Sequence, residues 1–268
     1  MRAIVLQYAP SWLDKASNHR TIETLLAGAE PTPGSIVVLP ELADTGWCLD
    51  DEAVYAGDTL DWATDLARRW EVTIQIGLAV REAASGPGTN AVAVVGARGL
   101  LAPLYHKIHT CGFSTEPACF AAGDRLVAVP VAGTVIAPQI CYDLRFPELQ
   151  RLAVAGGVEI LAFSANWPAV RHAHWRAMLI SRAIENQCFV LASNRTGVDP
   201  SLDYEGGSMI IAPTGEILAE GDADPSVIEA DLDLESLRAW RREFPALADR
   251  RPELLGNLSI VGREPSSN

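Results

Sequence analysis

Short apolar runs rich in β-branched residues alternate with segments of helical periodicity along the whole chain, and this alternation limits the fold more than any other feature. Residues 3–7 and 35–39 have the composition of buried strands. Between them, residues 16–29 place Ile22 and Leu26 on one face of a helix. Strands that alternate with helices in this way are typical of a layered α/β fold, in which helices cover the faces of a sheet.

Two predicted hairpins interrupt the alternation of strands and helices. Apolar runs at 91–97 and 100–104 flank a two-residue turn, and residues 207–219 have a similar form. Because a hairpin pairs antiparallel strands, a single parallel sheet cannot hold all of the predicted strands. The sequence therefore predicts two mixed sheets that pack face to face between outer layers of helices.

No internal repeat, low-complexity tract or long linker divides the 268 residues. With 49% hydrophobic and 21% charged residues, a chain of this length can form one continuous core. We therefore predict one domain over residues 1–268, with a peripheral C-terminal tail from about residue 234.

The charge of the chain limits the partners that it can bind. Its 21 basic and 34 acidic side chains give a formal net charge of -13, which repels nucleic-acid phosphates and anionic membranes. No apolar stretch has the length of a bilayer span or of a signal-peptide core. We therefore expect a soluble, cytoplasmic protein without a nucleic-acid or membrane partner, although a local Arg or Lys can still attract an anionic small molecule into a pocket.

The five cysteines do not form a framework of disulfides or metal ligands. Their number is odd and their spacing includes no C-x-x-C pair, which suits neither a disulfide scaffold nor a structural zinc site. His172 and His174 are two residues apart, which places their rings on different faces of a helix. The sequence therefore predicts free thiols and no metal site.

Three reactive side chains each follow a predicted strand. Glu41 follows the strand at 35–39, Lys107 follows the run at 100–104, and Cys141 follows an apolar strand that ends at residue 140. The carboxyl ends of strands form the rim where ligands bind in α/β proteins, so residues that are remote in sequence can meet there. A single cysteine after a strand is usually an inert core thiol, and the expectation of a site therefore depends on all three residues together.

These side chains have the division of labour that amide cleavage requires, namely a nucleophile, a proton carrier and a group that stabilises a tetrahedral oxyanion. Cys141 would supply a thiolate, because a helix start near Pro147 and the Lys107 ammonium are expected to lower its pKa. Glu41 would accept the thiol proton, return it to the leaving amine and then activate water. Lys107 and the backbone N–H of Tyr142 would hold the oxyanion.

Longer motifs surround these residues. They are Leu39-Pro-Glu41 with Gly46-Trp47, Tyr105-His-Lys107-Ile-His109, Ile140-Cys-Tyr-Asp-Leu-Arg-Phe-Pro-Glu148, Asn166-Trp-Pro168, Arg182-Ala-Ile-Glu-Asn186, Asn194-Arg-Thr-Gly197 and Tyr204-Glu-Gly-Gly-Ser208. In this order they resemble the nitrilase superfamily of carbon–nitrogen hydrolases, and the resemblance spans nearly the whole chain.

The resemblance implies a four-layer α-β-β-α sandwich, a homodimer or higher homo-oligomer, and no metal or organic cofactor. It also implies a second glutamate between the lysine and the cysteine, and here Glu116 stands a few residues before Gly123-Asp124. Glu116 would orient the substrate and support Lys107, whereas from the sequence alone it could equally be a surface acid. The nucleophile motif is most similar to that of ω-amidases and related Nit-type amidases, which release ammonia from small amides, often of dicarboxylic acids.

Other residues bear on the substrate. Residues 110–115 differ from the pattern expected after the lysine motif, and this loop borders the pocket in relatives. N-carbamoyl amino acid hydrolases carry paired arginines after the nucleophile, whereas here Leu144 precedes Arg145. Asn166 and Trp167 are predicted to bind the substrate from the pocket wall.

The sequence predicts hydrolysis of a small-molecule amide through a cysteine thioester, giving a carboxylic acid and ammonia. Two alternatives stay open: a nitrile or N-carbamoyl hydrolase that uses the same triad, and a non-catalytic binding or scaffold protein with this fold. Asp143, Arg145 and Glu148 are expected to form an ion-pair network that braces the turn of the nucleophile.

Overall fold

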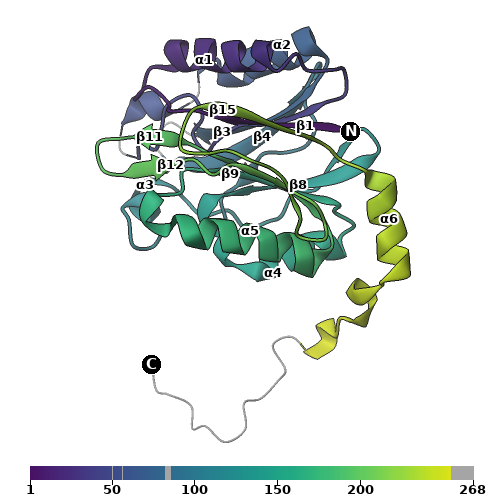
Figure 1. The fold of residues 1–268 in the computed structure, drawn as a ribbon. Helices are drawn as coiled ribbons and strands as arrows, with labels where there is room; N and C mark the ends of the chain where they lie inside the picture. Colours follow the sequence, from purple (N-terminus) through teal and green to yellow (C-terminus); the bar gives the residue numbers. More distant parts are fainter. Residues whose placement is uncertain (50, 56, 82–85, 255–268) are drawn as a thin grey trace, which may run out of the picture.

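Two β-sheets pack face to face at the centre of the molecule, and helices cover the outer face of each sheet (Figure 1). The computed structural model describes residues 1–49, 51–55, 57–81 and 86–254. One outer layer consists of α1 (Lys15–Gly28) and α2 (Thr59–Trp70), and the other consists of α4 (Pro147–Ala155) and α5 (His172–Asn186). This arrangement confirms the predicted four-layer α-β-β-α sandwich of two mixed sheets.

The strands are short and follow one another closely along the chain. They are β1 (Arg2–Gln7), β2 (Ile36–Val38), β3 (Thr73–Val80), β4 (Thr89–Gly96), β5 (Gly99–Leu100), β6 (Tyr105–His106), β7 (Val129–Val131), β8 (Thr134–Ile140), β9 (Ile160–Ala165), β10 (Phe189–Asn194), β11 (Thr196–Val198), β12 (Asp203–Glu205), β13 (Met209–Ile211), β14 (Ile217–Glu220) and β15 (Ser226–Asp231). The remaining elements are α3 (Glu116–Cys119), α6 (Leu234–Glu243) and the 3₁₀ helices η1 (Glu52–Val54), η2 (Cys141–Arg145), η3 (Ala169–Arg171), η4 (Ala246–Asp249) and η5 (Pro252–Leu254).

Each sheet has a parallel centre and antiparallel edges. The first sheet has the order β15-β1-β2-β3-β4-β5, with β6 also paired to β4, and the second has the order β14-β13-β10-β9-β8-β7. Strands β1, β2 and β3 are parallel, as are β8, β9 and β10. Hydrogen bonds between the sheets bring the carboxyl ends of both parallel sets to one edge, since Ser193 Oγ donates to the Leu6 carbonyl and Gln75 Nε2 donates to the Ala162 carbonyl.

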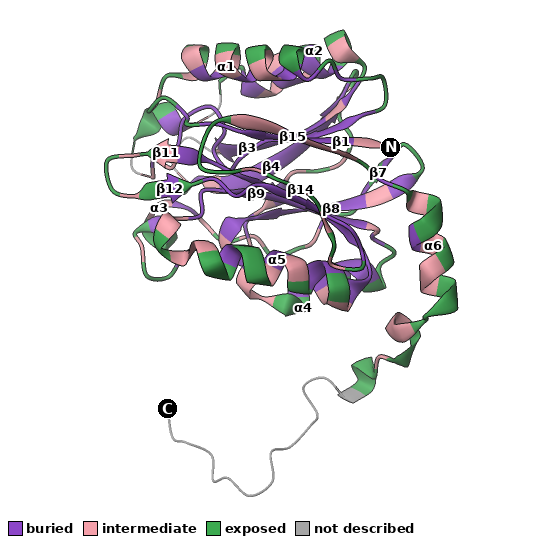
Figure 2. Ribbon diagram, in the orientation of Figure 1, coloured by how far each residue is buried: buried purple, intermediate pink, exposed green. Residues whose placement is uncertain are grey.

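The two faces of the first sheet belong to different parts of the core. Ala3 and Val5 of β1 pack between the sheets, whereas Ile4 and Leu6 of the same strand pack under α1 and α2. This alternation follows from the two-residue period of a strand, and it buries both faces of the sheet. Figure 2 shows the result, with buried strands in the middle and helices that are exposed only on their outer sides.

The predicted strand at 100–104 is wrong. Only Gly99–Leu100 pairs with β4 at this point, and Leu101 is 41% exposed instead of buried. Pro103 has no N–H to donate to a sheet, and the chain pairs with β4 again only at Tyr105–His106. The hairpin of β11 and β12 was not predicted from the sequence, because each of its strands is only three residues long.

Helix α6 lies beside the sandwich, at the edge of both sheets (Figure 1). It buries Leu237 against the core, and Arg241 donates hydrogen bonds to the carbonyls of Val158 and Gln187. The last part of the predicted tail, residues 255–268, lies outside the described residues. Across the described ranges, none of the helices combines the length and the apolar character that a membrane crossing requires.

Candidate active site

A cavity of about 400 Å³ opens at the edge where the parallel strands of both sheets end. Its lining includes Lys107, Cys141, Tyr142, Asn166 and Trp167. Strand β6 is antiparallel to β4, and β4 is antiparallel to β3, so β6 runs in the same direction as β3. Lys107, which follows β6, therefore reaches the same edge. The topology therefore brings together side chains that lie far apart in the sequence.

Cys141 is the first residue of the 3₁₀ helix η2 and has a φ of 40°, in the left-handed region. Such a conformation costs a residue other than glycine about 1–3 kcal/mol, so the surroundings must hold it in place. The buried Asp143 carboxylate accepts hydrogen bonds from the Ile140 N–H, the Tyr105 hydroxyl and the His109 N–H. Asp143 thus ties the nucleophile turn to the segment that carries Lys107.

Glu41 is fully buried just beyond the end of β2. Asn166 holds it twice, because its backbone N–H donates to Glu41 Oε2 at 2.9 Å and its amide Nδ2 donates to the Glu41 carbonyl at 2.9 Å. Gly77 of β3 allows the sheet to approach this loop closely, since a Cβ at that position would lie 2.6 Å from Glu41 Cα. The position of the Glu41 carboxylate therefore depends on β3 and on the end of β9 as well as on β2.

Lys107 and Glu116 form a buried ion pair beside Glu41. The Lys107 ammonium lies 2.8 Å from Glu41 Oε1, 2.8 Å from Glu116 Oε1 and 3.0 Å from Glu116 Oε2. Glu116 is fully buried at the start of α3, so the alternative that it is a surface acid is wrong. Its Oε2 also accepts the Cys111 N–H at 2.7 Å, which fixes the start of the loop at 111–115.

Asn90 is a site residue that the sequence analysis missed. It lies fully buried at the start of β4, and its Nδ2 donates to Glu41 Oε1 at 2.7 Å and to Glu116 Oε1 at 3.0 Å. One polar side chain ahead of the apolar run from Ala91 to Val95 was the available signal. A polar side chain in this position indicates that it binds another buried polar group, but the sequence does not show which group that is.

Burial and nearby charges shift the pKa values of Glu41, Lys107 and Cys141. Burial raises the pKa of the Glu41 carboxyl, with a further rise from Glu116 that Lys107 and Asn90 oppose. Burial would lower the pKa of the Lys107 ammonium, but the Glu41 and Glu116 carboxylates hold it well above its usual range. Lys107 therefore stays a cation between two carboxyl groups.

The predicted lowering of the Cys141 pKa is wrong. Burial and the negative charge of Glu41 raise the pKa of the Cys141 thiol well above its usual range. Lys107 and a hydrogen bond from the backbone of Asn166 act in the opposite direction but do not outweigh them. The resting Cys141 side chain is therefore a neutral thiol, and the Glu41 carboxyl group is close enough to act on its pKa.

The predicted ion-pair network of Asp143, Arg145 and Glu148 is also wrong. Asp143 binds Tyr105 and His109 instead, and Glu148 is exposed. Arg145 lines the cavity, and its guanidinium lies 4.7 Å from the centre of the Trp167 ring. The buried position of Leu144 beside it is held by Arg182 of α5, which donates to the Leu144 carbonyl.

The outer wall of the cavity combines aromatic rings with a second arginine. Trp167 is positioned by Asn194, whose Oδ1 accepts the Trp167 N–H at 2.7 Å. At the mouth, the Arg171 guanidinium lies 4.7 Å from the centre of the Phe113 ring, and Phe113 packs edge-on against Tyr142. Arg171 and Phe113 were not predicted from the sequence.

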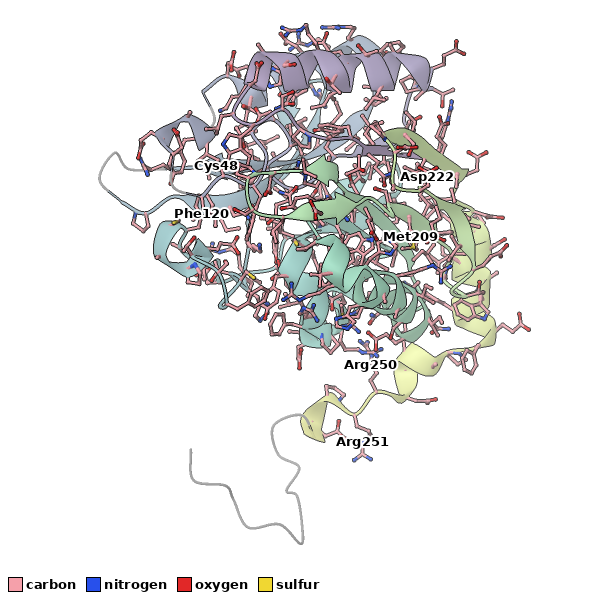
Figure 3. All side chains as sticks on the ribbon, turned by 60° about the vertical axis from the view of Figure 1, so that its left-hand side comes forward. Cys48, Phe120, Met209, Asp222, Arg250 and Arg251 are labelled. Carbon is pink, nitrogen blue, oxygen red and sulfur yellow. The ribbon has the colours of Figure 1, made fainter. Side chains whose placement is uncertain are left out.

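A small apolar cluster beside the cavity links the two carboxylate-bearing segments. Leu42 follows Glu41 and Phe120 follows α3, and both pack with Cys48. Figure 3 shows Cys48 and Phe120 on the same side of the molecule. Leu42 and Phe120 thus place the segments that carry Glu41 and Glu116 in one apolar cluster.

Known proteins match nearly the whole chain in sequence and in structure. The family model for carbon-nitrogen hydrolases matches residues 2–242. The chain is 34% identical over 253 residues to the ω-amidase YafV of Escherichia coli K12, with 93% of this chain and 96% of the relative covered. It is also 34% identical over 254 residues to the 2-oxoglutaramate amidase of Bacillus subtilis 168, with 93% and 97% covered. The structure of a CN-hydrolase superfamily protein from Xanthomonas campestris, with an arsenic adduct in its active site, matches with a TM-score of 0.86 at 31% identity and with 94% and 97% covered.

Proposed function

This chain belongs to the carbon–nitrogen hydrolase family, and we propose that it is an amidase that forms a thioester on Cys141 and releases ammonia. The observation that carries this proposal is the shared site, in which Cys141 and Lys107 line one cavity and the Lys107 ammonium contacts the Glu41 carboxylate. The scaffold alternative has no support, because relatives that match nearly the whole chain are amidases.

In the first half of the reaction, the Cys141 sulfur attacks the amide carbon while Glu41 takes the thiol proton. The negative charge that develops on the carbonyl oxygen is held by the Lys107 ammonium and by the backbone N–H of Tyr142. Tyr142 lies in the first turn of η2, where N–H groups have no acceptor within the helix. Glu41 then gives its proton to the nitrogen, the C–N bond breaks, and ammonia leaves behind a thioester.

In the second half, water replaces ammonia. Glu41 takes a proton from the water as its oxygen attacks the thioester carbon, and the same donors hold the new oxyanion. The C–S bond then breaks, the carboxylic acid leaves, and the thiolate of Cys141 takes the proton back from Glu41. Lys107 keeps its charge throughout, because its pKa lies well above neutrality.

We propose a monoamide of a small dicarboxylic acid, such as 2-oxoglutaramate, as the substrate. Arg145 and Arg171 line the cavity, and within the described ranges neither guanidinium has a carboxylate partner. Two unpaired arginines in a protein with a net charge of -13 favour an anionic ligand. The 2-oxoglutaramate amidase of Bacillus subtilis supports the same choice by its name.

The test compares amides with and without a distal carboxylate. Because a hydrogen bond to a charged group contributes about 1.5–3 kcal/mol, Arg145→Met and Arg171→Met should each lower kcat/KM for 2-oxoglutaramate by about 10- to 100-fold. Turnover of a neutral amide of similar length should change little. Arg176→Met is the matched control, because Arg176 pairs with Glu220 and does not line the cavity. Equal losses on charged and neutral amides would contradict the assignment of the arginines.

A nitrile or N-carbamoyl hydrolase would use the same three side chains. Matched nitriles, amides and N-carbamoyl compounds in one ammonia assay separate these activities, and we expect the amide to be hydrolysed fastest. A homo-oligomeric state and a cytoplasmic location stay predictions, which light scattering of the purified protein and cell fractionation would test.

A further inference from the structure

Asn90 contacts both carboxylates of the site without lining the cavity. Its Nδ2 lies 2.7 Å from Glu41 Oε1 and 3.0 Å from Glu116 Oε1. The Lys107 ammonium lies 2.8 Å from each of the same two oxygens. Four hydrogen bonds therefore form a closed cycle, the ring, in which the Oε1 atoms of Glu41 and Glu116 alternate with Asn90 Nδ2 and Lys107 Nζ.

This ring solves an electrostatic problem of the site. Two buried carboxylates share one cation, and like charges at this distance destabilise each other. A second lysine or arginine in place of Asn90 would neutralise the cluster and hold Glu41 too firmly in its charged form. An amide supplies two N–H donors without adding a charge, so Glu41 is held in place and can still accept a proton.

The orientation of the Asn90 amide follows from its neighbours. If Oδ1 took the place of Nδ2, an oxygen acceptor would lie 2.7 Å from Glu41 Oε1 and 3.0 Å from Glu116 Oε1, and the acceptors would repel each other. The NH₂ group is therefore assigned to face the carboxylates. Oδ1 then has no hydrogen-bond partner among the described residues, although it is buried.

We propose that Asn90 is a positioning residue that holds the Oε1 atoms of Glu41 and Glu116 beside the Lys107 ammonium and so keeps Glu41 in place to accept the proton of Cys141. This inference rests on the proposed function, in which Glu41 transfers the protons. The backbone of Asn90 adds to the effect, because its carbonyl accepts the Lys107 N–H at 2.9 Å. That backbone contact remains in every side-chain variant.

The charged and titratable groups that act on Glu41 come from several elements. The cation is Lys107, and the second carboxyl group is Glu116 of α3. Glu41 also interacts electrostatically with the Cys141 thiol, the Cys111 thiol and the Tyr204 hydroxyl of β12. Among the groups that lower the pKa of Glu41, Asn90 is the neutral side chain, and its loss therefore shifts that pKa upward.

The experiment measures the pH profile of kcat/KM for Asn90→Leu, which keeps the size of the side chain and removes both donors. We expect the acidic limb to move up by about one pH unit or more, and kcat near neutral pH to fall by about 10-fold or more. KM should change less than twofold, because Asn90 does not line the cavity. Asn90→Asp should lose more activity, since it adds a third carboxylate. Thr89→Val on the same strand is the matched control, because Thr89 contacts His106 and not the carboxylates.

A wild-type acidic limb in Asn90→Leu, or a raised KM with an unchanged limb, would overturn the proposal. If Asn90→Leu does not fold, Asn90→Thr keeps one hydroxyl donor and should place the limb between those of wild type and Asn90→Asp. Carboxyl ¹³C NMR, with Glu41→Gln to assign the signal, follows the titration of Glu41 without any turnover. If the Glu41 signal shifts in Asn90→Leu but the wild-type protein has no amidase activity, only the proposed function is refuted. If the wild-type protein is an active amidase and the Glu41 signal does not shift in Asn90→Leu, the role of Asn90 is refuted.

Discussion

Cys141 and Glu41 are both buried, and burial makes the charged form of each side chain costly. Their pKa values are accordingly raised, so a preformed thiolate is not the resting state. In the proposed mechanism the thiol proton passes to Glu41 as sulfur attacks, so Glu41 acts there as a general base and does not only stabilise an ion pair. The sequence could not give this result, because the direction of the shift depends on burial and on which charge lies nearest.

The pH dependence of kcat/KM follows from these shifts. Activity requires the Glu41 carboxylate, so it should fall as the pH drops through the raised pKa of that group, above the range of an exposed glutamate. On the alkaline side activity should stay level to about pH 9, because the pKa values of Cys141 and Lys107 lie well above their usual ranges. Initial rates across this range check both limbs. Activity that increases with pH through the ordinary range of a cysteine thiol would favour a preformed thiolate instead.

At the scale of the elements, strand β3 supports Glu41 through the missing side chain of Gly77. A methyl group there would lie 2.6 Å from Glu41 Cα and from the Pro40 carbonyl oxygen, both of which are backbone atoms. We expect Gly77→Ala to destabilise the protein by about 1–3 kcal/mol and to lower kcat by at least about 10-fold, because the carboxylate moves with the loop. Thermal unfolding and turnover measure the two effects.

Gly28→Ala in α1 is the control for Gly77→Ala. A Cβ at Gly28 meets no atom within 4 Å, and alanine favours helices, so stability should stay equal or rise. Full activity in a Gly77→Ala protein would show that the loop of Glu41 tolerates the displacement.

The elements also show what the sequence could predict. Apolar periodicity identified the helices of both outer layers and the central strands, and Glu41 and Cys141 follow strands that were predicted. Lys107 was selected after a predicted strand at 100–104, but it follows the short strand β6 instead. Apolar periodicity could not reveal that Arg171, in a 3₁₀ turn after β9, lies beside Phe113, because neither residue belongs to a periodic segment. Asn90 was missed for a different reason, since a single polar residue in a strand does not indicate which groups it faces.

At the scale of the whole molecule, the layer of α4 and α5 is a candidate surface for assembly. Leu152 of α4 is 60% exposed and Ile184 of α5 is 49% exposed. These apolar side chains lie on the surface of a protein whose net charge is -13. A homodimer that extends the sandwich would cover this layer, and a charge at its centre would then weaken the dimer. We expect Leu152→Glu to reduce the mass measured by light scattering, while Leu218→Glu on β14 should not. Equal masses for both variants and wild type would place the interface elsewhere.

The proposed reaction cleaves the amide through a thioester on Cys141. Rapid quenching of the enzyme with 2-oxoglutaramate, followed by intact-mass analysis and peptide mapping, tests it most directly. We predict a mass increase equal to the acyl group, located on Cys141 and lost as the acid is released, with neither adduct nor turnover in Cys141→Ala. Full turnover by Cys141→Ala, or an acyl group on another residue of the wild-type protein, would contradict the account.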